Sequence, residues 1–170
     1  MRILSDFRLL LLGLWLGAAC FLSFALAPSA FSVLPSRESA GAIVNQTLAI
    51  LNYSGIVSGL ILLASSYLPK NNFNRIRLWI ERILLLVVTA ACAFGQFFIG
   101  AKLQNLRAVI GRPVEELAAD DALRIAFNDL HGQSVTTLSA AMIAAFIAFF
   151  LIARRARNYE NQLKTNVELH

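Results

Sequence analysis

Long apolar segments alternate with short polar links along the chain, and this pattern predicts four membrane-spanning helices. No residue from Leu9 to Ser36, or from Ser39 to Pro69, carries a formal charge. About 20 apolar residues at 1.5 Å each cross the ~30 Å hydrocarbon core of a bilayer. The predicted spans are 9–33, 43–68, 79–101 and 133–153. The sequence therefore predicts an all-α, integral membrane four-helix bundle that forms a single domain over residues 1–170.

The links between the spans hold the polar residues and the signals for helix ends. The region 102–131 is the predicted external loop, and Asp120 or Asp121 can cap a new helix within it. Apolar residues then repeat at helical spacing at Leu123, Phe127 and Leu130. We expect this amphipathic helix to continue through Gly132 into the fourth span and the tail 154–170 to be frayed. At the start of the third helix, Arg77 can pair with Glu81.

Composition and charge agree with a membrane protein. The chain is 58% hydrophobic and 15% charged, with a mean hydropathy of +0.65. Soluble domains average about 45–50% apolar and about 25% charged residues. The net charge of +5 and pI near 9.8 fit lipid headgroups better than nucleic acid, because no stacking aromatics interleave with the basic clusters. We expect the lipid bilayer as partner, no nucleic acid, and a place in the cell membrane, which in a bacterium is the inner membrane.

The distribution of basic residues predicts the orientation. One side, formed by the N-terminus, the link after the second span and the C-terminal tail, carries ten Lys and Arg residues. The other side carries five. Because Lys and Arg are enriched in cytoplasmic loops, we expect both termini in the cytoplasm.

The first apolar segment also has features of a signal peptide. Arg2 and Arg8 precede it, and Ala25-Leu26-Ala27 resembles a cleavage site. Its length exceeds the ~7–15 residues of a signal-peptide core. We therefore favour a transmembrane helix with a kink at Pro28.

Polar residues inside the predicted spans concentrate toward the external side. Amides and imidazoles in hydrocarbon cost several kcal/mol unless they are paired, so they are expected to face the bundle interior. The candidate pocket residues are His131, Ser134, Gln96, Asn52 and Asn45. They predict a polar, outward-facing pocket. Alternatively, Asn52 and Gln96 only join helices, a contact worth ~0.6–2 kcal/mol each.

Small residues at four-residue spacing predict close helix packing. The pairs are Gly13 with Gly17 and Gly55 with Gly59, and the fourth span repeats the spacing at Ala140, Ala144 and Ala148. We expect Leu62 to face lipid. Such pairs serve packing within one chain as well as dimerisation, so a homo-oligomer stays possible without being established.

Catalytic motifs are largely missing from the sequence. It has no Cys-x-x-Cys, no His-Glu-x-x-His, no glycine-rich phosphate loop, and only one histidine, His131, besides the last residue. A hydrolytic triad would have to combine His131 with Ser134 and Asp129, which lie within six residues on one predicted helix. Ser134 is better placed to bond its own backbone. We predict no catalytic residues and no cofactor, and favour a non-catalytic protein.

Three sequence patterns carry a resemblance to a known family. They are Phe127-x-x-Leu130-His131-Gly132-x-Ser134, Gly13-x-Trp15-x-Gly17, and Phe31-x-x-Leu34-Pro35 followed by Gly41. Together they resemble the transmembrane-protein-205-like family, a four-span membrane domain of unknown function. More distantly, the chain is similar to membrane proteins of the copper-resistance D type and to haem-associated protoporphyrinogen oxidases, in which histidines near helix ends bind metal or haem. With one internal histidine, this chain departs from that second pattern.

Two functions of different class follow. The first is a non-catalytic membrane protein of uncharacterised activity, whose outer pocket binds a small solute or ion. The second is a haem- or copper-binding protein with a redox or metal-handling role, in which His131 acts with Met142 or with a ligand from a partner chain.

Overall fold

The computed structural model describes residues 2–67 and 75–168, which form helices and short turns without a strand. The elements are α1 (Arg2–Phe21), η1 (Leu22–Leu26), α2 (Ala27–Val33), α3 (Arg37–Ser65), α4 (Arg75–Phe94), η2 (Gly95–Gly100), α5 (Ala101–Ile110), η3 (Val114–Glu116) and α6 (Ala122–Glu168). Here η1 and η2 are π-helical turns and η3 is a 3-10 turn. Because α1, η1 and α2 follow without a break, as do α4, η2 and α5, the described residues build four long helical rods.

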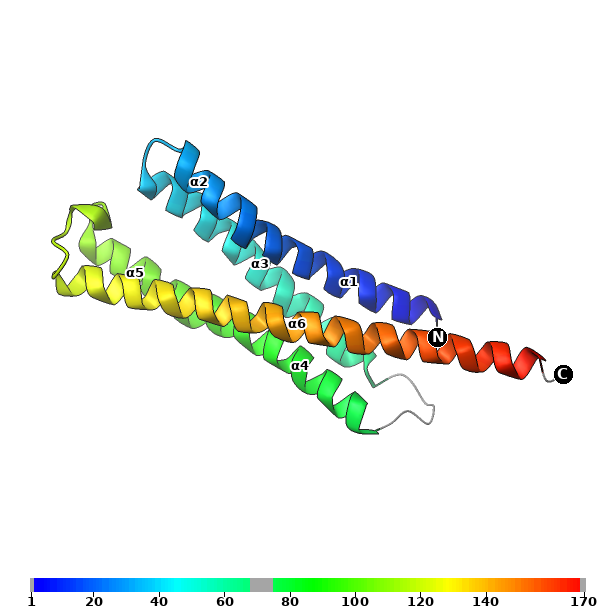
Figure 1. Cartoon of the computed structure of the whole chain (residues 1–170). Helices are drawn as coiled ribbons and strands as arrows, with labels where there is room; N and C mark the ends of the chain where they lie inside the picture. The colour runs from blue at the N-terminus through cyan, green and yellow to red at the C-terminus, as the bar shows by residue number, and fades with distance from the viewer. Residues whose placement is uncertain (1, 68–74, 169–170) are drawn as a thin grey trace.

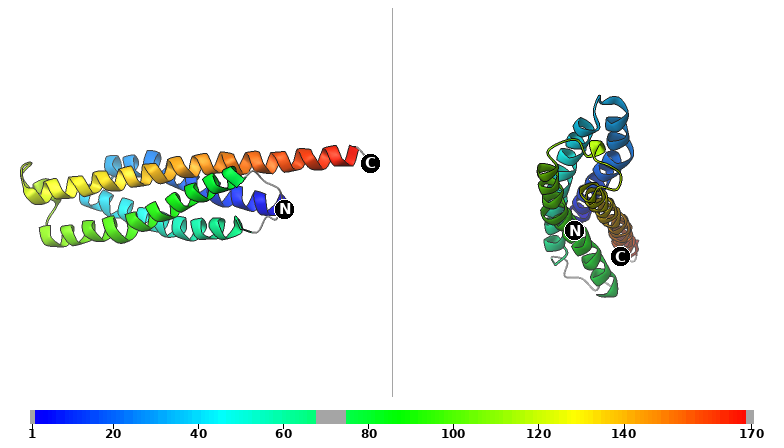
Figure 2. Two further views of the ribbon diagram at one scale, coloured as in Figure 1. Left: turned by 90° about the horizontal axis from the view of Figure 1, so that it is seen from below. Right: turned by 90° about the vertical axis from the view of Figure 1, so that its left-hand side faces the viewer.

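The rods lie side by side as a bundle. Figure 1 shows the start of α1 and the end of α6 at one end, and the α2–α3 and α5–α6 connections at the other. α1 and α4 each pack on both α3 and α6, which closes a ring of four helices that is seen end-on in Figure 2. We call the end that holds the start of α1 the inner end, and the opposite end the outer end.

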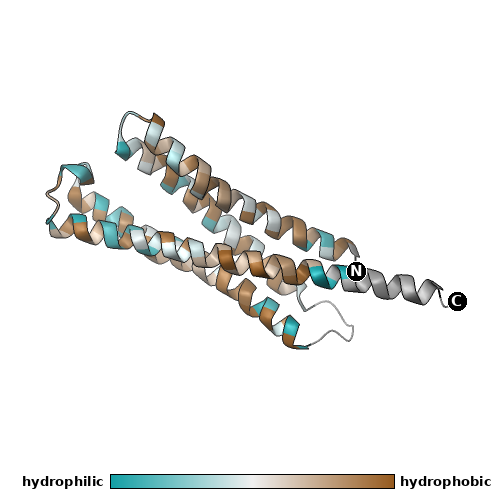
Figure 3. Ribbon diagram, in the orientation of Figure 1, coloured by the Kyte–Doolittle hydropathy of each residue, from teal (hydrophilic) through white to brown (hydrophobic). Residues whose placement is uncertain are grey.

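The hydropathy of the rods confirms the predicted fold class. Each contains a segment long and apolar enough to cross a membrane: Ile3–Val33, Arg37–Ser65, Arg75–Ile110 and Ala122–Arg155. Figure 3 shows apolar residues along the middle of the bundle and hydrophilic residues near the helix ends and outer connections. The protein is an all-α, multi-pass membrane protein built as a four-helix bundle.

The helices are longer than the predicted membrane-crossing segments. The second helix begins at Arg37 and ends at Ser65, whereas the predicted end at Leu68 lies outside the described residues. The predicted loop 102–131 is mostly helical, because α5 continues to Ile110 and α6 begins at Ala122. The tail that we expected to be frayed continues α6 to Glu168. Apolarity marks only the part of a helix inside hydrocarbon, so it underestimates helices that extend into water.

Two helix starts carry the caps that their sequences favour. The Asp121 carboxylate accepts a hydrogen bond from the Leu123 backbone N–H at 2.8 Å, as predicted for the start of α6. At the start of α3, the Ser36 hydroxyl oxygen accepts from the Ser39 N–H at 3.1 Å. From its cap, α6 runs through Gly132 without interruption, so the predicted continuation into the fourth span is confirmed.

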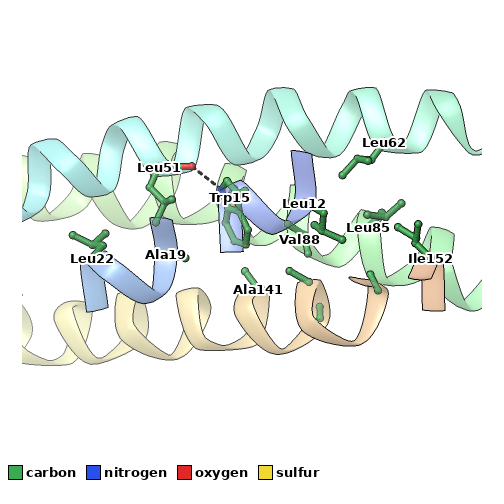
Figure 4. Packing of buried hydrophobic residues seen from close by; sticks show 14 residues of the cluster. Leu12, Trp15, Ala19, Leu22, Leu51, Leu62, Leu85, Val88, Ala141 and Ile152 are labelled. Carbon is green, nitrogen blue, oxygen red and sulfur yellow. Dashed lines mark hydrogen bonds between the residues drawn. The ribbon is translucent and has the colours of Figure 1, made fainter. Parts of the chain in front are cut away.

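Apolar side chains from all four rods form one core (Figure 4). The Trp15 ring lies at its centre, and its indole N–H donates to the Leu51 carbonyl at 3.0 Å, so the ring is buried without an unpaired donor. Leu62, which we expected to face lipid, is only 1% exposed. The expectation was wrong because lipid-facing and core-facing residues of a membrane helix are equally apolar.

Three of the four predicted packing glycines lie at helix contacts. A Cβ atom on Gly55 would stand 2.5 Å from the Cys92 sulfur, one on Gly59 would collide with Thr89, and one on Gly13 would stand 3.3 Å from Phe149. Gly17 is exposed and has nothing within 4 Å, so the prediction is wrong there. On α6 the buried alanines are Ala141, Ala144, Ala145 and Ala148, whereas Ala140 is exposed.

Both π-helical turns occur in the outer half of the bundle. The Ala27 N–H donates to the Leu22 carbonyl, five residues back, directly before Pro28. In a regular α-helix the Pro28 ring would clash with the carbonyl of Phe24, and the wider turn accommodates it. A π-turn thus lies directly before Pro28, where the sequence predicts a kink. Such π-turns are frequent at functional sites.

Candidate functional site

The outer half of the bundle encloses a cavity of about 490 Å³, which we call the chamber. η1 and α2 form one wall, α3 and α5 the back, and α6 the opposite wall. Its apolar lining residues are Leu22, Phe24, Ala27, Phe31, Val44, Leu48, Leu103, Val135, Leu138, Met142 and Ile143. Its polar lining residues are Ser23, Asn45, His131, Ser134 and Ser139. The chamber is therefore mainly apolar, which differs from the polar pocket expected from the sequence.

A smaller cavity of about 40 Å³ shares Asn45, Leu48, Leu103 and Ser134 with the chamber, and we call it the recess. α3, η2 and α5 supply most of its wall. Half of its lining residues are polar: Asn45, Asn52, Gln96, Gln104 and Ser134. Gly95 and Gly100, from the second π-turn, line it as well and leave room for these side chains. The two cavities together form an apolar compartment with a small polar side pocket.

All five residues singled out from the sequence line one or both cavities. Asn45 and Ser134 line both, His131 lines only the chamber, and Asn52 and Gln96 line only the recess. Asn52 is buried, whereas His131 is exposed at the rim of the chamber. Among the described residues, neither Asp129 nor Ser134 forms a hydrogen bond with the His131 ring.

Arg107 on α5 contacts several residues at the outer rim of the chamber. With the Asn45 amide oriented so that its oxygen faces the guanidinium, that oxygen accepts a hydrogen bond from Arg107 at 2.9 Å. The same guanidinium lies 5.3 Å from the centre of the Phe127 ring. Glu38 and Glu115 interact electrostatically with Arg107. Asn45 is thus held at the rim by a cation whose charge is countered by neighbouring carboxylates.

The inner end holds a buried charged cluster that the sequence did not reveal. Arg8 on α1 is 2% exposed and donates to the Glu81 carboxylate on α4 at 2.5 Å. Arg155 on α6 donates to the other oxygen of Glu81 at 3.3 Å. Arg8 also reaches the Leu62 carbonyl on α3 at 3.4 Å, while its Nε atom is buried without a partner among the described residues. The cluster therefore ties all four rods together.

The position of Glu81 corrects one prediction and explains why the cluster was missed. Glu81 pairs with Arg8 and Arg155, from distant parts of the sequence, rather than with Arg77 one turn away. Arg8 and Arg155 flank apolar runs, where arginine ordinarily lies at the membrane surface. One indication of the cluster was present in the sequence: Glu81 lies just inside the predicted span 79–101. An acidic side chain inside the membrane needs a cationic partner.

Next to this cluster, a third arginine connects the inner ends of α3 and α4. Arg82 donates to the Ser66 hydroxyl at 3.1 Å and to the Ser66 carbonyl at 3.0 Å. Its guanidinium also lies 4.0 Å from the centre of the Tyr67 ring. These contacts satisfy the carbonyl end of α3.

Helix geometry limits what metal site His131 can form. Within residues 2–67 and 75–168, no group of three or more His, Cys, Asp or Glu side chains is arranged to hold an ion. His131 and Met142 both line the chamber, but they are eleven residues apart on the same continuous helix. At 1.5 Å per residue this separates them by about 16 Å along the axis. Two ligands of one metal ion must lie within a few Å, so the predicted combination of His131 with Met142 is excluded.

Comparison with known proteins gives one family match. No curated protein and no solved structure matches the chain. The sequence matches the family model described as a domain of unknown function (DUF4149) over residues 10–111, which is more than half of the chain. The match covers most of the first rod, all of α3, and the rod that ends with α5. Because it stops before α6, the resemblance of the Leu130-His131-Gly132-x-Ser134 junction to the transmembrane-protein-205-like family stays a prediction. The chain belongs to the DUF4149 family of proteins with a domain of unknown function.

Proposed function

We propose that this membrane protein binds a small solute in the chamber and recess of its outer half, with both termini in the cytoplasm and the chamber on the external side. The observation that carries the proposal is the convergence of polar residues from α3, η2 and α6 on two adjoining cavities. Buried polar groups cost free energy unless they are satisfied, and a ligand can supply the missing hydrogen bonds. No catalytic role is proposed for these residues.

The π-turns support the same assignment. η1 contributes Leu22, Ser23 and Phe24 to the chamber, and η2 contributes Gly95 and Gln96 to the recess. A π-turn disrupts regular helix hydrogen bonding, and η2 contains no proline that would require one, so its place in the recess wall favours a functional reason.

A screen for thermal stabilisation tests the proposal. Wild-type protein in lipid nanodiscs is heated with a library of small molecules, and the compounds that raise the melting temperature are retested on His131→Ala and Gln96→Leu. Stabilisation by the same compounds should be lost in both variants, while their helical content and elution volume stay unchanged. Gln133→Ala on α6 and Gln46→Leu on α3 are matched controls, because neither residue lines the described cavities. Equal stabilisation of wild type and both cavity variants would place binding elsewhere.

A haem or copper site is the second candidate, favoured by the exposed imidazole of His131 at the chamber rim. Since Met142 is too distant, a further ligand would have to come from a second chain. An absorbance spectrum of protein purified after growth with haem precursor or copper separates the two functions. A Soret or copper absorbance band that disappears in His131→Ala would favour the metal function.

A further inference from the structure

We infer that the ligand of the outer cavities is an uncharged amphiphile with an elongated apolar body and a compact hydrogen-bonding head, such as a hydroxyl or amide, and that it enters from the outer leaflet. This inference rests on the proposed function and adds the chemical class of the ligand and its route.

The recess sets the size and charge of the head. Its volume of about 40 Å³ is a few times the ~10–15 Å³ that one water molecule needs on the same measure, so it admits a compact polar group of a few non-hydrogen atoms. Its polar walls consist of three kinds of neutral side chain, from Asn, Gln and Ser residues, and no Asp, Glu, Lys or Arg lines either cavity. A charged head would be desolvated there without a counter-charge, which is strongly unfavourable. Phosphate and ammonium heads are therefore disfavoured by the uncharged walls of the recess.

The chamber lies at the depth of the outer half of the hydrocarbon core. Arg8 and Arg155 both contact Glu81, so these three residues mark one level at the inner end. About 20 helical residues cross the hydrocarbon core. Counted outward from Arg8 and from Arg155, 20 residues end at Pro28 on the first rod and at Val135 on α6. Ser134 thus lies at the outer boundary of the hydrocarbon, and the recess extends inward from it, because Asn52 is only ten residues from Leu62, whose carbonyl Arg8 reaches.

From that boundary the apolar part of the chamber extends toward the middle of the bilayer. Its lining on α6 continues from Val135 to Ile143, which is about 12 Å along the helix. The hydrocarbon of one leaflet is about 15 Å deep. An apolar body in the chamber would therefore lie at the depth of the acyl chains of the outer leaflet, while the recess offers its head polar contacts within that depth.

The chamber is reached from the side of the bundle. α1 packs closely on α6, but after the π-turn the chain packs on α3 instead, so α2 leaves the α6 surface. This leaves an opening between the first rod and α6. Chamber-lining residues on both sides of the opening are exposed, including Phe24 at 77% and Ile143 at 62%. They are apolar side chains on the lipid-facing surface. The opening between α2 and α6 therefore faces the outer leaflet rather than only the water.

Photolabelling in nanodiscs tests this inference. The probe is tetradecanol with a diazirine on its terminal carbon, and the comparison probes carry the same tail with a sulfate or a trimethylammonium head. Tetradecanol should label the segments 22–27 and 138–143, saturably and in competition with unlabelled tetradecanol. The two charged probes should label them at least tenfold less. Leu138→Trp, which fills the chamber, should reduce the saturable labelling by tetradecanol at least tenfold.

The control variant is Leu86→Trp on α4, where Leu86 is 57% exposed and lines neither cavity; its labelling should equal that of wild type. Equal labelling by charged and neutral probes, or labelling unaffected by Leu138→Trp, would overturn the inference. Water-soluble compounds that stabilise the protein through His131 and Gln96 would in that case still support the proposed function, so the two failures can be told apart.

Discussion

Glu81 is the side chain on which the inner end of the bundle depends most. Its carboxylate lies between two guanidinium groups from α1 and α6, away from water. A buried ion pair contributes little net stability relative to apolar residues, because removing both charges from water is costly. Removing only one partner is different, since the remaining charge stays buried and uncompensated.

We therefore expect Glu81→Gln to destabilise the protein by about 3–5 kcal/mol, because Arg8 and Arg155 would face each other without a counter-charge. Thermal unfolding in detergent, followed by circular dichroism, measures the effect. Glu116→Gln, an exposed glutamate in η3, is the control and should leave the melting temperature unchanged. A melting temperature of Glu81→Gln equal to that of the control would mean that the two arginines find other partners.

The glycines give a second prediction at the scale of single residues. A methyl group on Gly55 or Gly59 meets Cys92 or Thr89 at a helix contact, so Gly55→Ala and Gly59→Ala should each destabilise by about 1–3 kcal/mol. Gly17→Ala adds its methyl group to an exposed surface and should be neutral or slightly stabilising, because alanine favours helix formation. Folded yield and melting temperature in one detergent provide the comparison. If Gly17→Ala proved as harmful as Gly59→Ala, the helix contacts would have to be reassigned.

At the scale of elements, sequence patterns predicted where helices exist better than which way they face. The fourth helix was predictable because Leu123, Phe127 and Leu130 repeat on one face and an Asp121 cap precedes them. Inside the membrane this contrast disappears, since both lipid and core contact apolar side chains. Gly17 and Gly59 occupy equivalent positions in identical spacings, yet one is exposed and the other is packed against Thr89. The rotation of a membrane helix about its axis is fixed by the neighbouring helices, and it produces no pattern in the helix's own sequence.

The Asp121 cap at the start of α6 can be tested directly. Asp121→Ala removes the acceptor for the Leu123 N–H and should destabilise the first turn by about 1 kcal/mol. Hydrogen exchange of the amides between Leu123 and Ile125 should become about fivefold faster. Asp120→Ala, at the adjacent exposed residue, is the matched control and should leave the exchange rates unchanged. Similar exchange in both variants would show that the cap is not made in solution.

For the whole molecule, the testable feature is the orientation in the membrane. The ten-to-five division of Lys and Arg residues predicts that the inner end lies in the cytoplasm. A reporter fused after Lys164 should behave as cytoplasmic, and one inserted near Glu116 as external. Both insertions lie outside the packed core, so the reporters should not disturb folding. Reporters on one and the same side would contradict the orientation and the outward-facing chamber.

The candidate site was predictable only in part at this scale. The outward bias of Asn45, Gln96, His131 and Ser134 indicated that polar groups would meet, because depth can be counted along a helix. The apolar character of the chamber could not be foreseen, because it arises from the separation of α2 from α6 after a π-turn, and no sequence pattern marked that turn except Pro28. The charged cluster joins residues 73 and 74 positions apart, and such pairings leave no periodic signal.

The uninterrupted length of α6 has a mechanical consequence. Its 47 residues make a rod of about 70 Å, of which one stretch forms the chamber wall, another holds Arg155, and the last continues past the other rods (Figure 1). A rigid rod that is gripped near its middle acts as a lever. A tilt of the chamber wall would displace the opposite tip in proportion to its distance from the grip, so the two ends of the bundle are mechanically connected through α6.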